Sequence, residues 1–110
     1  MFRLLLAISL ATVGQAAPPV DFNRDVRPIL SDHCFKCHGP DEKERKAGLR
    51  LDSRDSVVQQ EVIIPGKSSS SELIHRITSS DPNYRMPPPA TGKSWTRAQI
   101  ETLRRWIDEG

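Results

Sequence analysis

The stretch Cys34-Phe35-Lys36-Cys37-His38 (C-F-K-C-H) decides how the rest of this 110-residue chain is interpreted. It has the C-x-x-C-H spacing that is typical of c-type haem attachment. Two thiols one helical turn apart can add to the two vinyl groups on one edge of a haem, and the adjacent histidine then points under the iron. We therefore predict one covalently bound haem c, attached through Cys34 and Cys37, with His38 as an axial ligand of the iron.

Three other interpretations of this stretch were weighed. A thioredoxin-like dithiol motif is expected in a strand-helix-strand context, and the flanking sequence shows none. A structural zinc site needs four ligands, and beyond the two cysteines and His38 only His33 or His75 could supply a nitrogen. A purely structural pair of cysteines leaves His38 unexplained. Haem attachment accounts for all three residues, whereas zinc and dithiol chemistry remain the alternatives.

Met86 is the predicted second axial ligand. It is the single methionine that remains if the N-terminal leader described below is removed, and it precedes a run of three prolines, Pro87 to Pro89. Residues before proline favour extended backbone, and consecutive prolines stiffen the segment that follows. Such a segment suits a weak thioether ligand, and His/Met ligation raises the potential of a cytochrome c. The alternative is a methionine that only fills a gap in the core.

The two remaining histidines are weaker candidates. His75 falls opposite the apolar face of its expected helix, so we predict a solvent-exposed side chain. The alternative is that His75, in place of Met86, is the second ligand of the haem iron and gives bis-histidine ligation. His33 adjoins Cys34 on the same side as His38 and is interpreted as a packing or rim residue. His38 itself needs an acceptor for its second ring nitrogen, and a backbone carbonyl near Pro40 is the expected one.

Hydrophobic periodicity predicts a mainly α protein with three or more short helices and long loops. The first helix carries apolar residues at helical spacing from Phe22 to Leu30 and runs to Cys34, with Pro28 expected in its first turn. No helix or strand could be assigned with preference to residues 41–61. The proline run from residue 87 predicts an extended loop within Asn83 to Ala90.

The two later helices are predicted from capping boxes followed by apolar faces. Ser69 and Glu72 have the required spacing for one helix, and Thr96 and Gln99 have it for the other. Trp95 is placed to pack against Ile100 as a hydrophobic staple of the last helix. The predicted buried faces are Leu73, Ile74 and Ile77 in the earlier helix, and Ile100, Leu103, Trp106 and Ile107 in the later one.

The N-terminus has the layout of a secretory signal peptide. Arg3 is followed by an apolar run from Leu4 to Val13 and then by small residues, which predicts cleavage after Ala16. The run is about half of the roughly 20 residues that a membrane-spanning helix needs. We expect a leader over residues 1–16, a linker over 17–21 and one domain over 22–110, with no integral membrane segment after cleavage.

The charge balance excludes one class of partner. The chain has 16 Lys and Arg residues, of which Arg3 lies in the predicted leader, against 14 Asp and Glu residues. A mature chain so close to neutral lacks the concentrated basic surface that nucleic acid binding requires. Its five remaining aromatic residues are few for a core, and a haem could supply the missing apolar surface.

Taken together, these residues resemble the planctomycete-type cytochrome c domain, a branch of the class I cytochromes c. The resemblance covers nearly all of the chain from Asp21 onward. It rests on F-N-R-D-V-R-P-I-L-S-D-H-C-F-K-C-H-G-P-D (22–41), G-L-R-L-D (48–52), P-G-K-S-S-S-S-E-L-I-H-R-I (65–77), M-P-P-P (86–89) and the closing 103–109. It implies a small class I cytochrome c-like fold around a covalently bound haem, with His38 and Met86 as axial ligands.

The resemblance also bears on function. It implies an exported, periplasmic or otherwise extracytoplasmic electron-transfer protein that is not itself an enzyme and that works with redox partner proteins. Domains of this kind commonly open a longer exported protein. The alternative is therefore a haem module of a larger extracytoplasmic oxidoreductase, or a peroxidase-like enzyme.

Overall fold

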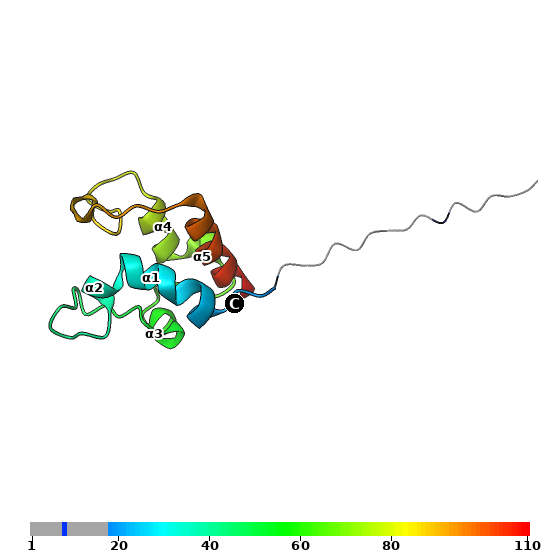
Figure 1. Cartoon of the computed structure of the whole chain (residues 1–110), viewed down its shortest axis with the longest axis horizontal. Helices are drawn as coiled ribbons and strands as arrows, with labels where there is room; N and C mark the ends of the chain where they lie inside the picture. The colour runs from blue at the N-terminus through cyan, green and yellow to red at the C-terminus, as the bar shows by residue number, and fades with distance from the viewer. Residues whose placement is uncertain (1–7, 9–17) are drawn as a thin grey trace, which may run out of the picture.

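The computed structural model describes residue 8 and residues 18–110, so the predicted signal peptide falls almost wholly outside the described residues. The described part is helical and contains no strand (Figure 1). None of its helices is both long and apolar enough to cross a membrane. The prediction of a mainly α protein is confirmed. The α-helices are α1 (Arg27–His33), α2 (Phe35–His38), α3 (Arg54–Gln59), α4 (Glu72–Thr78) and α5 (Arg97–Glu109), with shorter turns η1 (Phe22–Val26), η2 (Ser68–Ser70) and η3 (Pro89–Thr91).

The first helical stretch begins earlier than its proline. Asp21 caps η1 by accepting a hydrogen bond from the backbone N–H of Arg24 at 2.8 Å. The N–H of Arg27 then donates to the carbonyl of Phe22, five residues back, which makes η1 a π-turn. Pro28 follows in the first turn of α1, as predicted, where its missing N–H is tolerated.

The segment that the sequence left open contains α3. The Ser53 side chain accepts a hydrogen bond from the N–H of Ser56 at 3.1 Å and so caps the helix. Val57 of this helix is completely buried. Its burial ties α3 to the core, although most of the surrounding segment is polar.

The predicted capping box of α4 is wrong. The residue that precedes the helix is Ser71, and Ser69 lies in η2. The Ser71 hydroxyl does not cap α4, because it donates to the carbonyl of Lys67 at 2.8 Å and accepts from the N–H of Ile64 at 2.9 Å. The predicted buried face is confirmed, and it consists of Leu73, Ile74 and Ile77.

The last helix follows its local signals closely. Thr96 and Gln99 form the predicted capping box, with reciprocal hydrogen bonds of 3.1 and 3.0 Å. Three of the four residues predicted to be buried are so, namely Leu103, Trp106 and Ile107, but Ile100 is only partly buried.

The proline-rich loop differs slightly from the expected extended chain. Pro89 opens the 3-10 turn η3, in which it occupies a first-turn position. A proline at the start of a helical turn loses no hydrogen bond, because that N–H has no partner within the turn. The expectation of an extended segment over 83–90 is therefore wrong at its last two residues. It is also wrong at Asn83 and Tyr84, which lie in a turn where the N–H groups of Tyr84 and Arg85 donate to the Asp81 carbonyl at 3.0 and 2.8 Å.

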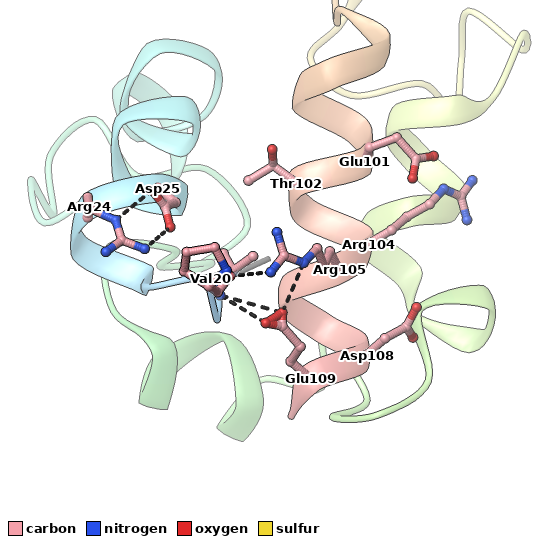
Figure 2. A pocket seen from close by; sticks show the side chains of 10 residues that line it. Val20, Arg24, Asp25, Glu101, Thr102, Arg104, Arg105, Asp108 and Glu109 are labelled. Carbon is pink, nitrogen blue, oxygen red and sulfur yellow. Dashed lines mark hydrogen bonds and ion pairs between the residues drawn. The ribbon is translucent and has the colours of Figure 1, made fainter. Parts of the chain in front are cut away.

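The two ends of the described domain lie together, as Figure 1 shows. The N–H of Val20 donates to the Glu109 carboxylate at 2.9 Å, and Phe22 packs on Trp106 with ring centroids 5.3 Å apart. A hollow between η1 and α5 is lined by charged side chains, several of which are paired with each other (Figure 2). The short helix α2 and the proline-rich loop lie at the opposite end of the domain (Figure 1).

Candidate functional site

The C-x-x-C-H stretch forms one helical turn. The carbonyl of Cys34 accepts hydrogen bonds from the N–H of Cys37 at 3.2 Å and from the N–H of His38 at 2.8 Å. The turn ends at Gly39, where an added Cβ would lie 2.3 Å from the carbonyl oxygen of Phe35. Only glycine allows the chain to leave the turn so closely against its own backbone. The two thiols and the imidazole are thereby presented within a single short element.

Two pockets meet at this turn, and Cys34, His38 and Met86 line both of them. The structure therefore brings Met86 to the attachment site from a loop that lies 48 residues further along the chain than His38. The first pocket is completed by Cys37, Pro87 and Pro88 together with polar residues of its rim. The second pocket has mainly apolar walls, formed by Leu49, Leu51, Val62, Leu73 and Ile77, with Glu72 and Arg76 beside them.

His38 is left with an unsatisfied ring nitrogen. Its Nδ1 is buried and has no hydrogen-bond partner among the described residues. Burial lowers the pKa of His38, and the backbone carbonyls of Lys46 and Leu49 oppose this shift without forming a hydrogen bond to Nδ1. The neutral imidazole, the form that binds metals, is therefore favoured.

The expected acceptor for His38 is not where the sequence placed it. The carbonyls of Gly39 and Pro40 accept hydrogen bonds from the Arg45 guanidinium, at 3.0 and 3.1 Å. Because Nδ1 of His38 has no hydrogen-bond partner among the described residues, the prediction of a carbonyl near Pro40 as that partner is wrong in this structure. These carbonyls are used to hold the loop that follows α2.

Cys34 and Cys37 are not joined by a disulfide bond. Burial, together with the neighbouring Cys37, raises the pKa of the Cys34 thiol to about 12. Cysteines that act in dithiol redox motifs have lowered pKa values, because the thiolate is the reactive form. The environment of Cys34 thus argues against the dithiol interpretation.

The other two histidines have hydrogen-bond partners of their own, although His33 also lines the first pocket. His33 is buried, and its Nδ1 and Nε2 lie 2.8 Å from the carbonyl oxygens of Ile29 and Ser94. His75 is exposed, as predicted, with its Nε2 2.7 Å from the carbonyl of Ser69. Within residues 18–110, no three or more His, Cys, Asp or Glu side chains are grouped so that they could hold a metal ion.

The residues at this site fit a flat apolar group that carries a metal. The pocket walls offer apolar side chains, two thiols at one edge, and a buried imidazole nitrogen without a partner. A buried polar atom left unpaired is costly, and reorientation of the ring toward a metal and a new acceptor would remove that cost. Haem has the apolar surface, the vinyl groups and the iron that this set of residues requires.

Comparison with known proteins identifies the family. The family model of planctomycete cytochrome C matches residues 34–90, just over half of the chain. The matched segment begins at Cys34 and includes Cys37, His38 and Met86. No curated protein and no solved structure matches the chain. The chain therefore belongs to the planctomycete cytochrome c family, whose members are c-type cytochromes that bind haem.

Proposed function

We propose that this protein is an exported c-type cytochrome that transfers one electron at a time. One haem would be attached covalently through Cys34 and Cys37, with His38 and Met86 as the axial ligands of its iron. The observation that carries the proposal is the position of Met86, which lines with His38 the walls of both pockets at the attachment turn. A methionine that only filled the core would not be expected to line the same two pockets as the histidine of the C-x-x-C-H motif.

The chain's own residues account for how the cofactor would be held. Each thiol would add across a vinyl double bond, its sulfur to one carbon and its hydrogen to the other, so the reaction needs no oxidant. His38 would then supply a nitrogen ligand to the iron, and Met86 a thioether. Haem, once bound, supplies an iron that can gain and lose a single electron.

The pocket also explains how the electron would reach a partner. The rim of the first pocket, beside the two thiols, includes the exposed residues Lys36 and Lys93. An attached haem would therefore have one edge close to solvent. The near-neutral charge of the mature chain predicts weak long-range steering toward redox partner proteins.

Export is part of the proposal because of the N-terminal sequence. Covalent attachment suits an extracytoplasmic compartment, where a dissociated cofactor would be lost. The layout of residues 1–16 fits a cleaved leader. Mass spectrometry of protein recovered from the periplasm tests this directly, since the proposal predicts an N-terminus at Ala17.

Spectroscopy of Met86→Ala tests the axial ligation. The ferric holoprotein should show the weak sulfur-to-iron absorption band, and the variant should lack the band while keeping its covalent haem. Thr91→Ser is the matched control, because Thr91 lines the same pocket from an exposed position and serine keeps the hydroxyl that donates to the Pro88 carbonyl, so the band should be unchanged. Absence of the band in the unmodified protein would overturn His/Met ligation. Turnover of peroxide by that protein would then favour the peroxidase-like alternative.

A further inference from the structure

The backbone of Met86 is held on both sides. Its N–H donates to the carbonyl of Arg76, in the last turn of α4, at 3.1 Å. Its carbonyl accepts a hydrogen bond from the indole Nε1–H of Trp95 at 3.0 Å. The backbone of Met86 is thus hydrogen-bonded to α4 on one side and to Trp95, the residue before the N-cap of α5, on the other.

Trp95 is in turn stacked on His33. The two ring centroids are 3.9 Å apart and the ring planes differ by 12°. The His33 side chain is only 3% exposed, and the Trp95 residue is partly buried. The contact links the end of α1, immediately before Cys34, to the segment that leads into α5.

His33 is itself bound on both sides. Its Nδ1 lies 2.8 Å from the carbonyl oxygen of Ile29 in α1, and its Nε2 lies 2.8 Å from that of Ser94. A neutral imidazole has one N–H and donates to one of these carbonyls, whereas the protonated ring donates to both. Asp32 and Lys93, 3.3 Å apart, form an ion pair beside it, with Asp32 3.8 Å from Nδ1. The ring therefore joins α1 to residue 94 through polar contacts as well as through stacking.

We propose that Trp95 and His33 are positioning residues that hold Met86 at the haem site. This inference rests on the proposed function, because it assumes that the Met86 thioether binds iron. The contacts run from the end of α1, directly before the attachment turn, through His33 and Trp95 to the carbonyl of Met86. They fix the loop that carries the thioether relative to the turn that carries the two thiols.

The need for such a support follows from the loop. Between α4 and α5, the loop has short turns of its own at Asp81 to Arg85 and in η3, and the backbone of Met86 between them is held by its bonds to Arg76 and Trp95. A thioether is a weak ligand, and its bond to iron competes with any stronger ligand that enters the pocket. Ordering the loop in advance removes the entropic cost of bringing the sulfur to the metal.

The experiment titrates imidazole into ferric holoprotein and follows the loss of the sulfur-to-iron band. Trp95→Phe keeps an aromatic ring against His33 but removes the N–H that Met86 uses. Loss of this hydrogen bond should lower the apparent Kd for imidazole by roughly three- to tenfold. His33→Leu removes the aromatic stack and the polar contacts to the Ile29 and Ser94 carbonyls, and should lower the Kd at least as much. It also serves as the readout if Trp95→Phe cannot be purified.

Trp106→Phe is the matched control. Trp106 is buried against Phe22, and no hydrogen bond of its indole is found among the described residues. The same substitution there should destabilise the fold while leaving the imidazole Kd unchanged. An equal shift of the Kd in Trp95→Phe and Trp106→Phe, or no shift in Trp95→Phe and His33→Leu, would overturn the positioning role.

Failure of the proposed ligation gives a different result. If Met86 does not bind iron, the unmodified protein lacks the band, and Met86→Ala binds imidazole with the same affinity as the unmodified protein. That outcome overturns the ligation, and with it the role of Trp95. A retained band with unchanged Kd values in Trp95→Phe and His33→Leu overturns the positioning role alone.

Discussion

Replacing Leu103 with alanine tests whether α5 anchors this small domain. Leu103 is completely buried, on the face of α5 that also carries Trp106 and Ile107. The substitution removes buried methyl groups and leaves a cavity that the neighbouring helices can only partly fill. The expected loss in the free energy of unfolding is about 3 kcal/mol, within the roughly 2–5 kcal/mol found for such changes.

That loss should be easy to measure. For a domain of this size, about 1 kcal/mol shifts the melting temperature by roughly 4–8 °C, so Leu103→Ala should lower Tm by about 12–24 °C. The assay is thermal unfolding of the holoprotein, followed by far-ultraviolet circular dichroism. Denaturant unfolding of the same samples gives the free energy independently.

Thr102→Ala is the neighbouring control on the same helix (Figure 2). Thr102 is only partly buried, and its hydroxyl donates to the carbonyl of Ala98 at 2.9 Å. Alanine has the higher helix propensity, so the control should change the stability by less than about 1 kcal/mol. A Leu103→Ala loss below about 1 kcal/mol, or one equal to that of Thr102→Ala, would refute the assigned core.

Two further predictions concern the ends of α5. Thr96→Ala should lower the free energy of unfolding by about 1 kcal/mol, because the capping box is lost, and Thr96→Ser should keep most of that stability. Denaturant unfolding measures both variants. An alanine variant as stable as the serine variant would contradict the capping role. Hydrogen bonds from the Ser68 N–H and hydroxyl hold the pKa of the Asp108 carboxyl below its usual 3.8. This contribution is present above the usual pKa and is lost as the pH falls through the lowered one. Melting curves between about pH 5 and pH 2 should therefore show a steeper acid loss for the unmodified protein than for Asp108→Asn, and parallel losses would count against the interaction.

The parts of the fold that could be predicted are those that depend on residues close together in the sequence. The Thr96 and Gln99 capping box needs only two side chains three residues apart, and the structure contains it. The run of serines before α4 offered several possible caps. The Ser71 hydroxyl instead accepts from the N–H of Ile64 and donates to the carbonyl of Lys67, seven and four residues earlier, and no capping pattern in the sequence marks these bonds.

The start of α3 carried a signal that sequence reasoning missed. Ser53 stands directly before the helix and caps it through the N–H of Ser56, yet the apolar residues that follow are few. Periodicity is weak in a helix of six residues, so burial of Val57 depends on contacts with distant parts of the chain. Short helices of this kind are stabilised by packing more than by their own sequence.

The candidate site also contains residues that a local pattern marks and contacts that no local pattern marks. Cys34, Cys37 and His38 could be predicted because their spacing alone carries the chemistry, and Met86 because the leader and the proline run leave few alternatives. The bond from Trp95 to Met86 and the stack of Trp95 on His33 were not predicted. They join residues that are up to 62 positions apart, and no local pattern marks them.

The most direct test of the account is the mass of the purified protein after expression in a host that carries out cytochrome c maturation. We expect a coloured protein whose mass equals that of the polypeptide plus one haem, with the haem retained after denaturation. Replacement of both Cys34 and Cys37 by alanine should abolish the covalent adduct. A colourless product at the mass of the bare polypeptide, or an adduct that survives loss of both cysteines, would contradict it.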